Sequence, residues 1–116
     1  MTAYDAYVEG RFLLESQRFD EALKVLTESH QELPHFKTAL YLSECCRAMG
    51  LNTERSFYLK CAYELHPKSN EAATRYAEDL LKTGFTSAGM NVLKSVLSRS
   101  PEYGPARKLV LTVSPQ

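Results

Sequence analysis

Apolar residues recur along this chain at the three- and four-residue spacing of amphipathic helices, and no stretch shows a convincing strand pattern. The pattern predicts six helices of similar length and a shorter seventh. We expect the first helix over about residues 3–16 and the third over about 36–49. The seventh should have Pro105 in its first turn and run to about Thr112. Phe12 and Phe57 are among the residues expected to pack inside.

Glycine, proline and small polar residues mark the expected helix ends. Gly50 and Gly84 suit the ends of the third and fifth helices because glycine tolerates positive φ. The connections are only two to four residues long, so sequential helices become antiparallel neighbours. The fold class is therefore all-α, with three antiparallel hairpins and one terminal helix. The expected starts of the fourth, fifth and sixth helices are Thr53, Ser69 or Asn70, and Thr86 or Ser87.

Pro34, Pro67 and Pro101 follow the second, fourth and sixth helices at intervals of 33 and 34 residues. A period in this range is the mark of a stacked-repeat protein. Each repeat places small or apolar residues, with Arg55 as the exception, at the same steps before its proline. The three sets are Ala6, Gly10, Leu13, Ala22 and Leu26; Ala39, Ser43, Cys46, Arg55 and Leu59; and Ala73, Ala77, Leu80, Gly89 and Leu93.

This pattern resembles the tetratricopeptide repeat (TPR), including the segment Phe19-Asp20-Glu21-Ala22-Leu23. Arg55 departs from it, because the family prefers a small residue there. The second hairpin is therefore splayed, or the register is off by one. Sel1-like and pentatricopeptide repeats are the alternatives. The resemblance implies one domain over residues 1–116, with repeats at about 3–36, 36–69 and 70–103 and a capping helix at about 104–113.

The resemblance also implies a right-handed α-solenoid with a concave groove lined by the first helix of each hairpin. Tyr4 and Tyr7 offer contact area there, although they can equally serve to cover the N-terminal end of the stack. The residues expected to line a partner-binding groove are Tyr4, Tyr7, Arg11, Leu14, Lys37, Leu40, Glu44, Arg47, Thr74 and Glu78.

Two branches of the family suggest sharper functions. The carboxylate clamp that holds the acidic tails of Hsp70 and Hsp90 needs Lys and Asn residues from the first helices and a further Lys and Arg from the third. The corresponding positions here favour it poorly, because only Arg75 fits and Glu71 would repel the ligand. The small bacterial chaperones of secreted translocator or needle subunits resemble this chain in size and repeat number. The clamp positions are Tyr7, Arg11, Tyr41, Glu71 and Arg75.

Charge and composition narrow the class of partner. The 14 basic and 14 acidic residues leave a formal net charge of zero, whereas nucleic-acid binding relies on a basic excess. No apolar run is long enough to span a bilayer, and no secretory signal is visible at the start. We therefore expect a cytoplasmic protein that binds a protein or peptide, with no nucleic-acid partner and no membrane insertion.

The reactive side chains form no recognisable catalytic or metal-binding pattern. Cys45, Cys46 and Cys61 lack the spacing of a metal site, and no third group orients a Cys–His pair. His30 and His66 lie near helix C-termini, where the helix dipole favours them. We expect no cofactor, no metal and no enzymatic activity.

The terminal helix is more apolar than a capping helix requires. Leu109, Val110, Leu111 and Val113 form a candidate association surface. The sequence thus predicts a non-enzymatic interaction module, an adaptor or co-chaperone that binds a peptide or client segment in its groove. The alternative is a structural subunit that docks or forms a homodimer through its terminal helices.

Overall fold

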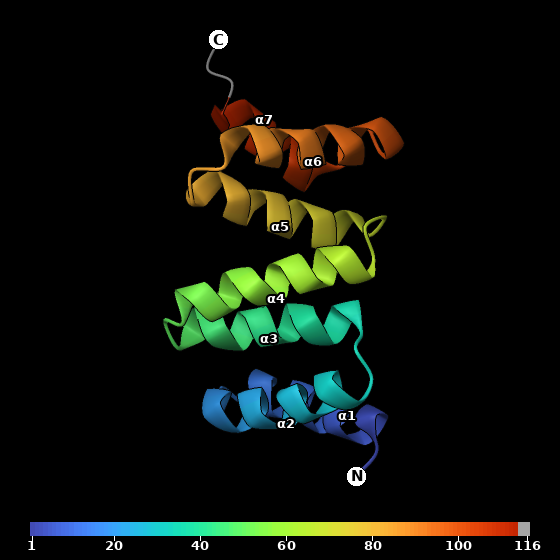
Figure 1. The fold of residues 1–116 in the computed structure, drawn as a ribbon, viewed down its shortest axis with the longest axis vertical. Helices are drawn as coiled ribbons and strands as arrows, with labels where there is room; N and C mark the ends of the chain where they lie inside the picture. Colours follow the sequence, from blue (N-terminus) through green and yellow to red (C-terminus); the bar gives the residue numbers. More distant parts are fainter. Residues whose placement is uncertain (114–116) are drawn as a thin grey trace. The chain divides into compact units, whose positions relative to one another are not determined.

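The computed structural model describes residues 1–113 and shows seven α-helices in that part of the chain, with no strand among them (Figure 1). Sequential helices pack in pairs, α1 on α2, α3 on α4 and α5 on α6. The helix bounds are α1 Ala3–Glu15, α2 Phe19–Glu32, α3 Phe36–Ala48, α4 Asn52–Leu65, α5 Asn70–Lys82, α6 Thr86–Arg99 and α7 Gly104–Val113.

The helices repeat in step with the prolines. The first helices of the hairpins begin at residues 3, 36 and 70, and the second helices begin at residues 19, 52 and 86. Both series advance by 33 and then by 34 residues, as the prolines do. The predicted architecture of three hairpins and a terminal helix is confirmed.

The contacts within the chain group the helices into two compact units. The first unit, Met1–Leu65, holds α1 to α4, and the second, which begins at His66, holds α5 to α7. The expectation of a single domain over residues 1–116 stays a prediction, and its last three residues lie outside the described part of the chain.

Each first helix ends in the same turn. Gln17, Gly50 and Gly84 follow α1, α3 and α5 with φ angles of 62°, 72° and 92°. In each case the amide of this residue donates to the carbonyl three residues back, and the next amide donates to the carbonyl five residues back. This is the Schellman arrangement, which satisfies the last carbonyls of a helix. The first hairpin differs in building the turn with a non-glycine residue.

These turns fix the register of the second hairpin. Arg55 follows Gly50 by the same number of residues that separate Ala22 from Gln17 and Gly89 from Gly84. The register is therefore correct, and Arg55 does occupy a position where the other hairpins have a small residue. Its side chain is half-buried, and α3 packs on α4 as extensively as α1 packs on α2, so the second hairpin is not splayed.

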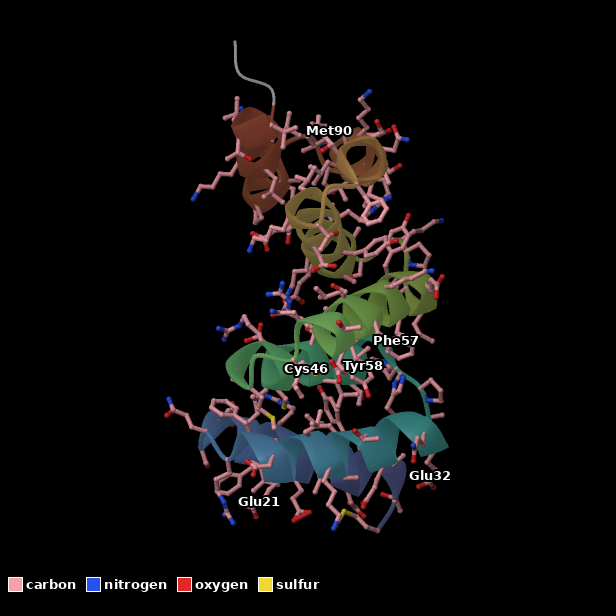
Figure 2. The ribbon with its side chains drawn as sticks, turned by 60° about the vertical axis from the view of Figure 1, so that its left-hand side comes forward. Glu21, Glu32, Cys46, Phe57, Tyr58 and Met90 are labelled. Carbon is pink, nitrogen blue, oxygen red and sulfur yellow. The ribbon has the colours of Figure 1, made fainter. Side chains whose placement is uncertain are left out.

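The core of the first unit depends on a close approach of α1 and α2. A Cβ atom at Gly10 would overlap Cγ and Cδ2 of Leu26, which is fully buried. Leu26 belongs to a cluster that joins the two hairpins of this unit, and Tyr58 of α4, labelled in Figure 2, packs against that cluster. The buried residues of the cluster are Leu13, Ala22, Leu26, Leu42 and Cys45.

The second unit has a similar close crossing, but here the glycine lies on the second helix of the hairpin. A Cβ atom at Gly89 of α6 would lie 2.8 Å from Cδ2 of Leu81 and 3.1 Å from the carbonyl oxygen of Ala77, both on α5. α7 packs against α6 and α5 and buries Ala106 completely. Small residues thus permit the closest helix contacts in both units.

Three local expectations were wrong. Phe12 and Phe57 are 62% and 60% exposed, because the faces of α1 and α4 that carry them point away from the hairpin cores. Thr53 is not an N-cap, since α4 already begins at Asn52. Ser69 does cap α5, where its hydroxyl oxygen accepts a hydrogen bond from the amide of Ala72 at 3.1 Å.

Gly10→Ala should lower the free energy of unfolding by about 1–3 kcal/mol, because the added methyl group overpacks a filled core. The sign is informative, since glycine to alanine inside a helix otherwise stabilises by roughly 0.5–1 kcal/mol. Denaturant titration followed by circular dichroism measures the change. The exposed neighbour supplies the control, Glu9→Ala, which should stay within about 0.5 kcal/mol of the parent. A Gly10→Ala variant as stable as the parent would contradict the close crossing.

Gln17→Gly should raise the free energy of unfolding by about 0.5–1 kcal/mol, because glycine adopts positive φ without the steric cost of a side chain. The same denaturant titration measures the gain. Ser16→Gly is the matched control, since Ser16 has a φ of −85° that any residue adopts. This control should lose stability, and equal effects of the two substitutions would rule out the strained turn as the cause.

Candidate functional site

The predicted groove residues of the first unit form two matching stripes. Tyr4, Tyr7, Arg11 and Leu14 on α1 are spaced by three and four residues, which places them on one helix face. The equivalent stripe on α3 has the same spacing one repeat later. It consists of Lys37, Leu40, Glu44 and Arg47.

Two residues of the α1 stripe, Tyr7 and Arg11, form a cluster with Tyr41 of α3. The ring centroids of Tyr7 and Tyr41 are 5.9 Å apart, and the guanidinium carbon of Arg11 lies 5.8 Å from the first and 5.6 Å from the second. Tyr4 extends the cluster, with its ring 6.4 Å from that of Tyr7. A guanidinium within about 6 Å of an aromatic ring gains cation–π attraction, so the arginine is held against both rings.

The environment keeps Tyr7 protonated. Burial raises the pKa of its hydroxyl above the usual value, Tyr41 adds to the rise, and the positive charge of Arg11 opposes it. The hydroxyl therefore remains a neutral donor and acceptor at physiological pH.

A pocket of about 210 Å³ opens beside the cluster, at the N-terminal end of α1 and the turn between α2 and α3. Tyr4 is 70% exposed and Leu33 is 63% exposed, so both rim residues are accessible from solvent. The lining residues are Ala3, Tyr4, Tyr7, Ser29, Leu33, His35 and Thr38.

The polar groups of this pocket are largely engaged within the protein. The Ser29 hydroxyl donates to the Ala3 carbonyl oxygen at 2.7 Å, and Nδ1 of His35 accepts from the amide of Lys37 at 3.1 Å. The wall that remains is formed by methyl groups, a leucine and two tyrosine rings. Such a pocket suits an aliphatic side chain better than a charged group.

Sequence reasoning found only part of this pocket. Tyr4 and Tyr7 were predicted, but Ser29, Leu33 and Thr38 come from α2, the following turn and α3, whose proximity depends on how the hairpins pack. The signal that could have found them is Pro34, since the pocket lies at the turn that this residue marks.

The remaining predicted groove residues of the first unit differ in their exposure and contacts. Leu14 is half-buried and packs against the core cluster, whereas Leu40 is 4% exposed, so its side chain offers no surface to a partner in this structure. Glu44 and Arg47 form an ion pair at 3.1 Å. Lys37 is exposed beside the pocket turn.

The predicted residues of the second unit also differ from one another in exposure. Thr74 is 4% exposed, and Glu78 is half-buried, with its carboxylate 3.9 Å from the Lys82 ammonium group. On α7, Leu111 is 74% exposed. The other three residues of the candidate association surface, Leu109, Val110 and Val113, are half-buried.

The cysteines lack the properties of nucleophiles. Burial, with smaller contributions from Cys46 and Glu44, raises the pKa of Cys45 to about 11. Burial also raises the pKa of Cys46 and of Cys61. A thiol with a raised pKa forms little of the reactive thiolate.

The histidine interpretation needs one correction. Burial lowers the pKa of His30, so a favourable charge at the helix end does not explain this residue. Its ring instead meets the Tyr58 ring edge-on, with centroids 5.9 Å apart. Within residues 1–113, no group of three or more His, Cys, Asp or Glu side chains is arranged to hold a metal ion, and none of the helices could cross a membrane.

Comparison with known proteins gives a clear result for the fold alone. No protein-family model matches the chain, and no curated protein matches its sequence. Among solved structures, the first TPR of Spaghetti (RPAP3), bound to the HSP90 peptide SRMEEVD, is similar with a TM-score of 0.82 and 13% identity, over 97% of this chain and 90% of that one.

Two further structures support the same conclusion. The Sgt2 TPR domain from Aspergillus fumigatus has a TM-score of 0.74 and 11% identity, over 91% of this chain and 72% of that one. The Yersinia enterocolitica type III secretion chaperone SycD, in complex with a peptide of the translocator YopD, has a TM-score of 0.73 and 18% identity, over 95% and 85%. The seven helices of this chain have the fold of three tetratricopeptide repeats followed by a capping helix.

Proposed function

We propose that this chain is a non-enzymatic protein-interaction module that binds a peptide or client segment on the first-helix face of its first unit. The observation that carries the proposal is the stacking of Arg11 on Tyr7 and Tyr41 beside an apolar pocket. Tyrosine and arginine are the side chains enriched at binding hot spots.

The geometry supports a peptide with two kinds of contact. An aliphatic side chain fits the pocket, where the engaged polar groups of Ser29 and His35 leave a mostly apolar wall. An acidic group next to it can pair with Arg11 or with the exposed Lys37. The tyrosines that replace the Lys and Asn residues of a carboxylate clamp favour this mode over capture of a chain terminus alone.

The solved neighbours support peptide binding as the general mode. One holds an HSP90 peptide and another holds a peptide of a translocator. By analogy, the role of this chain is that of a cytoplasmic adaptor or co-chaperone without a nucleic-acid partner. In the second unit, Glu78 stays a predicted binding residue of that unit's own surface, whereas Thr74 is 4% exposed and offers little surface to a partner.

Tyr7→Ala and Arg11→Ala should each weaken peptide binding about tenfold or more, because each removes one member of the Tyr7–Arg11–Tyr41 cluster. The probes are peptides selected from a random phage-displayed library on the parent protein and then measured by fluorescence polarisation. Arg11→Lys should recover only part of the affinity, because lysine keeps the charge but lacks the planar guanidinium that lies over the rings.

The matched controls carry the same residue types outside this face. Phe57→Ala removes an aromatic ring that is 60% exposed on α4, and Arg18→Ala removes an arginine whose ion pair with Glu21 is exposed. Both should bind the selected peptides as the parent does. If the Tyr7 and Arg11 variants fold and bind with unchanged affinity, the proposed surface is wrong.

A second candidate function is favoured by α7. Leu111 holds the repeat position of Gly10, Ser43 and Ala77, which are all buried, yet it is 74% exposed. An exposed leucine at this position suits docking of a partner or of another copy at the C-terminal helix.

For this second candidate, Leu111→Glu should lower the mass that light scattering measures at high concentration, because a contact formed on α7 would then bury an uncompensated glutamate. Thr112→Glu, on the adjacent exposed residue, is the matched control and should leave the mass unchanged. Identical masses for the parent and Leu111→Glu at every concentration would exclude α7 as an association surface.

A further inference from the structure

A second groove, of about 470 Å³, lies between α1 and α2 in the first unit. Phe12, which lines it, is 62% exposed, and Val8 on the preceding turn is 46% exposed. Figure 2 shows Glu21 on the side of α2 that faces away from α3 and α4. The lining includes Glu9, Phe12, Lys24, Val25 and Glu28.

The internal repeat identifies this groove as a hairpin-docking face. One repeat later, the positions of Phe12 and Val25 are held by Cys45 and Tyr58, both of which pack against the core of the first hairpin. On the second hairpin, the face that carries these residues is therefore covered by α2. On the first hairpin the same face is open and still carries apolar side chains.

The charges around the groove are self-complementary. Arg18 and Glu21 pair with each other at 2.7 Å, whereas Lys24 and Glu28 are exposed one turn apart on α2. In two antiparallel α2 helices related by a twofold axis, Lys24 of each copy lies opposite Glu28 of the other. A twofold interface requires a patch of this kind, which matches itself.

From these observations we propose that the α1–α2 groove is the docking face for a second copy of this chain. Phe12 and Val25 supply the apolar centre, with Val8 one turn away on α1, and Lys24 and Glu28 supply a polar rim that fixes the antiparallel register. The surface is separate from the Tyr7–Arg11–Tyr41 cluster, so dimer formation and peptide binding are independent properties.

The first experiment measures mass against concentration by sedimentation equilibrium, from about 1 µM to about 500 µM, a range in which mass action reveals weak dimers. The parent chain should approach twice the monomer mass. Phe12→Glu should raise the dissociation constant at least about tenfold, because it places a charge in the apolar centre. Phe57→Glu is the matched control, since Phe57 is equally exposed but lies outside the groove, and it should dimerise like the parent.

The second experiment tests the register by charge reversal. Lys24→Glu alone and Glu28→Lys alone should each be monomeric at concentrations where the parent is dimeric, because each brings like charges together. An equimolar mixture of the two variants should form heterodimers, since every rim pair is then of opposite sign. The double variant, with both charges exchanged, should dimerise again at low salt.

Three results would overturn the proposal: a monomeric parent over the whole range, a Phe12→Glu variant as dimeric as the parent, or a mixture that stays monomeric. Circular dichroism of each variant verifies that its helices are retained. Peptide affinity should be unchanged in Phe12→Glu. Failure of the docking face can therefore be distinguished from failure of the proposed peptide surface.

Discussion

The close crossing of α1 and α2 at Gly10 is the constraint on which the rest of the first unit depends. With no side chain at this point, Leu26 fills the space directly beneath the α1 backbone and is fully buried. Leu26 in turn belongs to the cluster that holds α3 and α4 against the first hairpin. A larger residue at Gly10 would move α2, and with it every surface that α2 positions, including the wall of the proposed peptide pocket at Ser29.

The architecture was predictable because each repeat carries the same local signals. The period of the prolines, the small residues at Gly10, Ser43 and Ala77, and the glycines after α3 and α5 are all short-range features of the sequence, and the structure confirms each of them. Gln17 shows why the first turn was less visible. Its left-handed backbone is imposed by the hairpin around it rather than by its own residue type.

The surfaces were harder to predict than the helices, because helical spacing identifies a face but not its exposure. Leu40 and Tyr41 are adjacent on α3, yet Leu40 is 4% exposed while Tyr41 meets Tyr7 and Arg11. Phe12 was expected inside because it is large and apolar, but it is exposed. Its repeat equivalent, Cys45, is buried because the first hairpin packs against it. Burial in a repeat protein depends on the neighbouring repeat as much as on the residue itself.

This dependence suggests where such a fold carries its specificity. Residues that hold the same position in each repeat serve the stack when a neighbour covers them, and they become available for binding when none does. The first unit offers two such surfaces with different chemistry, a cation–π cluster of tyrosines and arginine beside an apolar pocket and a phenylalanine groove with an alternating charged rim. The first of these surfaces is shared by α1 and α3, whereas the second lies between α1 and α2, so the proposed peptide site and the proposed docking face use different side chains.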